Sequence, residues 1–325
     1  MERWIDRGDG VWQVKLPLPF PLQWVNAYVV RDRGEVDVID PGLHTKEAVA
    51  VWEAAAEAIG FGWRDVRSVA LTHHHPDHYG LAGWMQERSG APVRMSRAAR
   101  EHAETLWGER ADAAASATLS LFERHGFPAT DAAAMRAHLD GFVPLVSPQP
   151  AEISLLEAGE RVRLGAREYV ALDTPGHAAG HLSFWDEAAG RLFCGDHVLP
   201  GITPNVSLLP FGDADPLGTF LASLEDAGRL PVREAFPGHR EPFGHYAERA
   251  RAIAAHHHER LSRMESLTAE PATAYAVCRA MFGDKLSTHQ LRFALSETIA
   301  HLVYLERRGR VAGIEDAGVV RYVAR

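Results

Sequence analysis

Residues 72–78 read Thr72-His73-His74-His75-Pro76-Asp77-His78, and this segment is the most informative in the chain. It follows a short apolar run at 66–71 that is typical of a buried strand, and Pro76 ends that strand. Residues two apart at a strand end project to the same side, so His73 and His75 can bind one metal ion. Asp77 and His78 fall in the turn that opens the next helix, where their offset allows them to bind a second ion.

Three later segments have the same arrangement, with a possible metal ligand directly after a predicted strand. They are Thr174-Pro175-Gly176-His177, Cys194-Gly195-Asp196 and Phe236-Pro237-Gly238-His239. The ends of strands are where α/β folds open a crevice, and imidazole nitrogen with carboxylate oxygen suits zinc, manganese or iron. A single Pro-Gly-His triplet is more often a turn than a site, but an ordered set of four such segments is hard to obtain by chance.

The set predicts a centre with two divalent metal ions, with zinc as the first choice and manganese or iron as alternatives. Its seven ligands are His73, His75 and His177 on the first ion, Asp77, His78 and His239 on the second, and Asp196 as a bridge. The catalytic role of Asp77 and Asp196 is to position a bridging water. The pKa of such a water falls towards neutrality, so it supplies hydroxide at physiological pH.

The order of predicted strands and helices indicates an α/β chain that forms an αββα sandwich, with two sheets inside and helices outside. Residues 1–245 form the catalytic domain, and residues 96–140 form a helical insertion within it. The insertion is Ala-rich, begins with Ser96 as a helix N-cap, and breaks at Gly126-Phe127-Pro128 into two or three helices.

Residues 246–325 form a second, mostly helical module. A long helix spans 247–266, and Pro271 at a first-turn position opens another to residue 282. A capping box of Ser287 and Gln290 opens a third helix to about residue 308. With a closing β-hairpin at 311–323, this is the outline of a winged helix-turn-helix module.

Composition restricts the function classes. The formal net charge of −9 argues against a surface built mainly to bind phosphate backbones. Only Cys194 and Cys278 are cysteines, which argues against a disulfide framework, and no run of about 18 apolar residues could span a membrane. The first residues contain no apolar stretch that resembles a signal peptide, so a cytoplasmic protein is expected. The oligomeric state is left open.

The ordered motifs resemble those of a known family. His73-x-His75-x-Asp77-His78, followed by Gly176-His177, Gly195-Asp196 and Gly238-His239, is similar to the successive motifs of the metallo-β-lactamase-fold hydrolases over residues 10–245. The resemblance implies that Asp40, in Ile39-Asp40-Pro41-Gly42, supports the ligands without binding metal.

Two finer resemblances follow. The segment from Thr174 to His181 is similar to the hydroxyacylglutathione hydrolase (glyoxalase II) branch, in which the first His is the ligand, so His181 is not expected to bind metal. Residues 291–309 and the closing hairpin resemble a lactamase-β-like branch with an appended winged helix. That branch contains endoribonucleases and thioesterases.

Other polar residues are weighed against ordinary structural roles. The run His256-His257-His258 lies mid-helix, where a solvated face is expected. His197 follows a ligand directly, and packing and substrate contact are equally good interpretations. Asn205 lies on a loop that leaves the metal strand, and a turn role is favoured over a hydrogen bond to substrate. His289 and His301 are given no function.

Four functions are compared. The leading one is hydrolysis of an ester, thioester or lactone, with a small-molecule acyl substrate. The second is phosphodiester cleavage in RNA, which a winged helix could hold. Residues 246–325 contain 12 Lys and Arg against 9 Asp and Glu, and the helix at 287–302 contains a single cation, Arg292. This is little positive charge for a module that binds a phosphate backbone.

A persulfide dioxygenase-like oxidoreductase with one iron comes third. A DNA-binding regulator without activity comes last, because the ligand set is complete.

The insertion has a larger apolar face than a free surface segment needs. The face comprises Leu106, Trp107, Leu119, Leu121 and Phe122. It either extends the core or, together with the C-terminal module, forms the wall of an apolar substrate pocket. The two interpretations are left open at equal weight.

Overall fold

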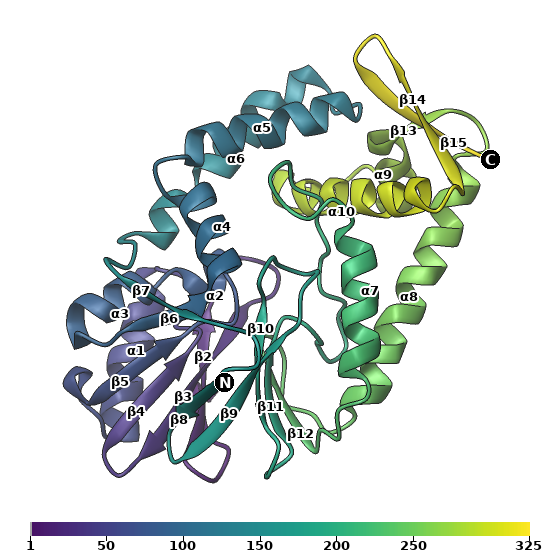
Figure 1. Ribbon diagram of the computed structural model, residues 1–325. Helices are drawn as coiled ribbons and strands as arrows, with labels where there is room; N and C mark the ends of the chain where they lie inside the picture. Colours follow the sequence, from purple (N-terminus) through teal and green to yellow (C-terminus); the bar gives the residue numbers. More distant parts are fainter. Residues whose placement is uncertain (1) are drawn as a thin grey trace.

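The computed structural model describes residues 2–325 and contains two β-sheets that face each other, with helices on both outer sides (Figure 1). The predicted αββα sandwich is therefore confirmed. The first sheet contains, in spatial order, β1 (Trp4–Asp6), β2 (Val11–Pro17), β3 (Trp24–Asp32), β4 (Glu35–Ile39), β5 (Val66–Ala70), β6 (Val93–Ser96) and β7 (Ile153–Leu156). The second contains β12 (Glu234–Pro237), β11 (Arg191–Gly195), β10 (Leu182–Asp186), β9 (Arg167–Asp173) and β8 (Arg161–Leu164).

Strand register brings distant parts of the sequence to one edge of the sandwich. β11 and β12 are parallel, and Gly195 pairs with Pro237, so the residues that follow each strand leave the sheet side by side. A hydrogen bond of 2.8 Å from the Leu182 amide to the Thr72 carbonyl joins the two sheets at the same edge. The segments that follow β5, β9, β11 and β12 are in this way brought towards one another.

An aromatic cluster between the sheets holds them face to face. Tyr28 on β3 packs against Phe193 and Phe236 of the second sheet, with ring centroids 5.2 and 5.5 Å apart. The Tyr28 hydroxyl donates a 2.7 Å hydrogen bond to the Pro237 carbonyl, which satisfies its buried polar group. This contact fixes the end of β12 against the first sheet.

The outer face of the first sheet is covered by helices α1 (Lys46–Ile59) and α3 (Ala82–Ser89), with the short α2 (Pro76–Tyr79) and a 3₁₀ turn η1 (Trp63–Asp65) between them. α1 begins because the Thr45 side chain accepts a hydrogen bond from the Ala48 amide, and it ends at Gly60 in the left-handed conformation. α2 begins at Pro76, directly after His75.

The predicted insertion contains three helices, α4 (Arg97–Trp107), α5 (Ala111–Arg124) and α6 (Ala132–Asp140), with 3₁₀ turns η2 (Ala129–Asp131) and η3 (Val143–Val146). Ser96 caps α4 as predicted, because its hydroxyl accepts a hydrogen bond from the Ala99 amide. Figure 1 shows α5 and α6 extending beyond the sheets towards α10.

The C-terminal region contains α8 (Tyr246–Leu267), β13 (Ala272–Thr273), α9 (Ala274–Phe282), α10 (Thr288–Arg307), β14 (Val311–Asp316) and β15 (Val319–Ala324). The capping box of Ser287 and Gln290 is present. The expectation that Pro271 opens a helix was wrong: α9 starts at Ala274, because the Thr273 side chain caps it, and Pro271 precedes β13. The winged-helix interpretation stays a prediction.

One helix on the second sheet had no counterpart in the sequence-based prediction. α7 (Pro216–Ala227) packs beside α8 on the outer face of that sheet (Figure 1). Its start carries two recognisable signals, since the Asp215 side chain accepts a hydrogen bond from the Gly218 amide and Pro216 occupies the first helical position.

One hydrophobic cluster is shared by the second sheet, the insertion and the C-terminal helices. Its buried members include Leu192 on β11, Phe122 on α5, Ile253 on α8 and Ile299 on α10. The boundary at residue 245 stays a prediction, but the core is continuous across it. Among residues 2–325, no helix combines the length and the apolar character needed to cross a bilayer.

This shared core predicts the behaviour of a chain that ends at Gly244. Each buried large apolar side chain contributes about 1.5–3 kcal/mol, so removing the C-terminal members of the cluster should exceed the roughly 5–15 kcal/mol by which domains are stable. We expect the shortened chain to aggregate and to lose cooperative thermal unfolding by circular dichroism. Cooperative unfolding near the temperature of the full chain would contradict a shared core.

Candidate metal centre

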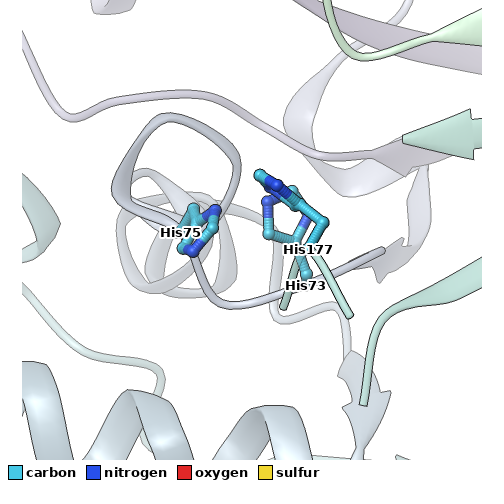
Figure 2. A group of neighbouring side chains, drawn as sticks. All are labelled: His73, His75 and His177. Atoms are coloured by element: carbon cyan, nitrogen blue, oxygen red, sulfur yellow. The ribbon is translucent and has the colours of Figure 1, made fainter. Parts of the chain in front are cut away.

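Three imidazoles from two distant loops form the first ligand group. His73 and His75 follow β5, and His177 lies in the loop between β9 and β10. One nitrogen of each ring lies within 4.8 Å of the others. Figure 2 shows the three rings grouped together. The sequence-based prediction named these three residues for one ion.

The second group combines one carboxylate with two imidazoles. Asp77 and His78 lie on α2, and His239 follows β12. Their ligand atoms also lie within 4.8 Å of one another. The distance from His239 Nε2 to Asp77 Oδ2 is 3.2 Å.

Asp196 lies between the two groups. Its Oδ2 is 3.7 Å from His177 Nε2 and 3.3 Å from His239 Nε2, and its Oδ1 is 3.4 Å from His78 Nε2. Ligand atoms bound at about 2.0–2.2 Å to a tetrahedral ion lie roughly 3.4 Å apart, so these spacings fit donor atoms that share metal ions. The position agrees with the predicted bridging role of Asp196.

Asp40 and Thr72 fix the orientation of two of these rings. Asp40 accepts hydrogen bonds from the Thr72 hydroxyl at 2.7 Å and from His78 Nδ1 at 2.9 Å. Because the Thr72 proton is used in this way, its oxygen accepts from His73 Nδ1 at 2.9 Å. Asp40 therefore supports the ligands as the resemblance implied. Thr72 was missed, and its position directly before His73 was the only available signal.

Two further rings are held by backbone carbonyls. His177 Nδ1 donates to the Asn205 carbonyl at 2.8 Å, and His239 Nδ1 donates to the Trp24 carbonyl at 3.0 Å. With their Nδ1 atoms engaged, the Nε2 atoms of His73, His78, His177 and His239 are buried without a hydrogen-bond partner in the described chain, and outside these two groups His257 on α8 shows the same pattern. Buried polar atoms rarely stay unpaired, and metal-binding imidazoles usually donate their second nitrogen to the protein, so this pattern fits a metal centre.

The same test separates His181 and His197 from the ligands. His181 Nδ1 bonds to the Thr174 hydroxyl at 2.8 Å, and its Nε2 accepts from the Asp196 amide at 3.2 Å. His197 bonds to Ser223 at 2.7 Å and to the Tyr246 hydroxyl at 3.3 Å. With both nitrogens of each ring used by the protein, His181 positions the Asp196 backbone, and His197 has a packing role.

Asn205 connects the first ligand group to the C-terminal helix. Its carbonyl holds His177, and its side-chain amide donates to Glu297 on α10 at 3.1 Å. Glu297 is also paired with Arg260 on α8. Asn205 is therefore a positioning residue, in addition to lining the cavity described below.

The expectation of a solvated face at residues 256–258 was wrong for His257. Its ring is fully buried, and its Nδ1 lies 3.0 Å from His301 Nε2. His257 lies on the side of α8 that packs against α10, whereas the next residue, His258, is exposed. The pair joins the two helices, and burial lowers the pKa of His257 to about 2, so its imidazole is neutral.

Electrostatics distinguish the two ligand groups. Burial and then the neighbouring imidazole of His78 hold the pKa of His73 well below its ordinary value, so its Nε2 is a free electron-pair donor. Burial alone would lower the pKa of His239, but Asp196 and Asp77 outweigh it and raise that pKa to about 10. A proton and a metal ion therefore compete for Nε2 of His239.

The position before His239 can hold only glycine, Gly238, because a side chain would meet two residues of the candidate centre. A Cβ at this position would lie 2.2 Å from Asp196 Oδ1 and 2.5 Å from His78 Cε1. Any larger residue would push apart the carboxylate and the ring that must share the centre. Glycine is required here for the close approach of the backbone to these side chains.

Two connected cavities open at the ligands. The metal cavity is lined by Asp77, Asp196 and His239, and its mouth by apolar residues such as Leu22 and Leu286. The insertion cavity extends from His75 and His177 between the insertion helices, where its lining includes Leu106, Trp107, Ala115, Phe122 and Leu139. Both cavities share His75, Pro76, His177, Asn205, Arg292 and Phe293. Of the five residues of the predicted apolar face, Leu106, Trp107 and Phe122 line this cavity, whereas Leu119 and Leu121 pack against the hydrophobic core.

Comparison with known proteins adds the following. A family model described as Metallo-beta-lactamase superfamily matches residues 24–239, and one described as Metallo-beta-lactamase-like, C-terminal domain, matches residues 261–325. A crystal structure of a metallo-beta-lactamase family protein from Thermus thermophilus is similar, with a TM-score of 0.88 and 34% identity. The match covers 97% of this chain and 99% of that one.

Three curated relatives are also similar. The probable metallo-hydrolase YqjP of Bacillus subtilis is 26% identical, over 97% of this chain and 98% of its own length. The human acyl-coenzyme A thioesterase MBLAC2 is 27% identical, over 77% of this chain and 84% of its own. The hydroxyacylglutathione hydrolase of Cereibacter sphaeroides is 30% identical, over 53% of this chain and 48% of its own, so the chain spans about half the length of that relative.

The hydrogen-bond pattern predicts opposite results for two histidines that lie four positions apart. His177→Ala removes a free Nε2, so the metal content by elemental analysis should fall from nearly two ions per chain to about one. His181→Ala should retain both ions and lose about tenfold in activity, because only the support of Asp196 is disturbed. Loss of metal from His181→Ala with retention in His177→Ala would reverse the assignment.

Proposed function

This chain belongs to the metallo-beta-lactamase superfamily and is a metallo-hydrolase, and from that premise we propose that it cleaves thioesters at a centre that holds two divalent metal ions. The observation that carries the proposal is the insertion cavity, which is mostly apolar and opens directly on His75 and His177. An acyl chain placed there would present its carbonyl carbon to the predicted ligands.

The donor set supports two ions with the predicted apportionment. His73, His75 and His177 would hold one, Asp77, His78 and His239 the other, and Asp196 would contribute an oxygen to each. When bound, a pair of divalent ions lowers the pKa of water and polarises a carbonyl oxygen. Imidazole and carboxylate donors make zinc the first candidate, with manganese and iron as alternatives.

The reaction adds water to the thioester carbonyl and breaks the C–S bond, which yields a carboxylic acid and a thiol. Asp77 and Asp196 face the space between the ligand groups, and imidazoles hold the pKa of Asp196 well below its ordinary value despite burial. Both carboxylates would therefore stay ionised and orient the attacking water. The apolar wall of the insertion cavity would exclude other water from the acyl group.

Three observations favour a thioester over RNA. The names of two relatives describe thioester substrates, acyl-coenzyme A and hydroxyacylglutathione. The lining of the insertion cavity is mostly apolar. Arg292, the single cation in the first half of α10, lines both cavities. An RNA-binding face needs its positive charge on an open surface.

A substrate panel tests the proposed reaction. We expect the zinc-, manganese- or iron-loaded protein to hydrolyse acyl thioesters faster than lactones, phosphodiesters or RNA, with thiol release followed by a colorimetric assay. Asp196→Ala should lower turnover by about a thousandfold or more, because the centre loses the carboxylate shared by both ligand groups. Preferential cleavage of RNA, or wild-type turnover in Asp196→Ala, would refute the proposal.

A second test addresses the insertion cavity. Ala115 on α5 lines the cavity, whereas Ala113 on the same helix is exposed. Ala115→Phe should fill part of the space, so kcat/KM should fall at least about tenfold for a twelve-carbon acyl thioester and little for an acetyl thioester. Ala113→Phe is the matched control. An equal effect of Ala115→Phe on both substrates would place the acyl chain elsewhere.

A further inference from the structure

Arg292 is a charged residue at the junction of the two cavities. It lies on the second turn of α10 and lines both the metal cavity and the insertion cavity, beside His75, Asn205 and His177. A substrate that occupies both cavities would lie against the residues that the two linings share, and Arg292 is the only cation among them. The thioester chemistry proposed above does not by itself need a cation at this place.

Arg292 has no ion-pair partner among the described residues, and burial, partly offset by the Asp77 carboxylate, lowers its pKa to about 10. Its guanidinium lies 4.3 Å from the ring centre of Phe293 and 5.2 Å from that of Phe142. Within residues 2–325 this guanidinium forms no ion pair and donates no hydrogen bond, whereas Glu297 one turn later is paired with Arg260. Its N–H donors therefore remain available to an anion that enters either cavity.

The groups around Arg292 leave it as the local positive charge. Burial and then the Arg292 charge lower the pKa of His138 to about 4 and also lower the pKa of His289, so both imidazoles are neutral at physiological pH. His289 stacks on Phe20 with ring centroids 4.6 Å apart. Its Nδ1 is buried and has no hydrogen-bond partner in the described chain. A guanidinium that lines two cavities without an ion-pair partner is a suitable site for an oxyanion.

Resting on the thioesterase function proposed above, we propose that Arg292 is a specificity-determining residue that binds a carboxylate or phosphate group of the substrate close to the scissile C–S bond. The planar guanidinium can hold two oxygens of such a group at once, and the rings of Phe142 and Phe293 keep its plane in place. The anionic group can belong to the acyl part or to the thiol part. The enzyme therefore selects thioesters by charge as well as by apolar length.

Kinetics with three butyryl- or succinyl-type substrates test this subsite. They are butyryl-N-acetylcysteamine, which is neutral, succinyl-N-acetylcysteamine, whose acyl part is anionic, and butyryl-coenzyme A, whose thiol part is anionic. Arg292→Gln should lower kcat/KM about 100-fold for whichever anionic substrate uses the subsite, mainly through KM, and less than about threefold for the neutral one. The substrate that responds identifies the source of the anion.

Two further variants make the result specific to the guanidinium. Arg292→Lys retains the charge without the planar pair of donors, so it should recover part of the loss on the anionic substrate. Arg307→Gln alters an exposed arginine at the far end of α10 and should match the wild type. An equal loss on all three substrates for both Arg292 variants would overturn the proposal and leave Arg292 with a structural role.

A binding measurement separates failure of the subsite from failure of the thioesterase function. In the metal-loaded protein, one acetate ion can occupy either the metal ions or Arg292, whereas one succinate ion can place a carboxylate at each. Calorimetry should show succinate binding more tightly than acetate, and Arg292→Gln should remove that preference. If no thioester is cleaved but this result holds, the subsite stands without the proposed reaction. If Arg292→Gln keeps the full preference for succinate, the subsite is wrong.

Discussion

The metal centre depends on hydrogen bonds that face away from it. Each of four imidazoles donates Nδ1 to an oxygen of the protein, so that Nε2 is left buried and available. Asp40 supports two of these rings, one directly and one through Thr72, and backbone carbonyls support the other two. A free imidazole can rotate and change tautomer, whereas these hydrogen bonds fix the orientation and the tautomer of the four rings in the candidate centre.

The sequence predicted the sandwich, and the residues that it named as ligands lie together in the fold, for a physical reason. The position of a residue that directly follows a strand is fixed by the sheet. Because β11 and β12 are parallel neighbours, Asp196 and His239, which follow them, lie close together. A candidate ligand next to the end of a strand can be recognised from the sequence alone, because the two features are adjacent in the chain. The same holds for the caps at Ser96 and Ser287, whose hydroxyls act on amides three residues away.

What the sequence could not supply was the environment of residues whose neighbours come from distant segments. His257 in a run of three histidines looks solvated, yet α10 covers it. The difference between His177 and His181 depends on which ring nitrogens are engaged, and only the folded chain decides that. From the sequence, Arg292 was only one positive charge in a predicted helix. No neighbouring residue in the sequence indicates that it lines two cavities in the folded chain.

The connection between β6 and β7 has a consequence for how such enzymes diverge. The two strands are parallel neighbours, with Ser96 beside Leu156, so residues 97–152 are a crossover whose ends are already anchored in the sheet. Crossovers of this kind tolerate changes in length, because neither strand has to move. α10 has no such freedom, since Glu297 holds the loop that holds His177. Relatives of this chain can therefore differ in the wall of the insertion cavity that residues 97–152 form, whereas the wall that α10 forms can change only together with the loop that holds His177.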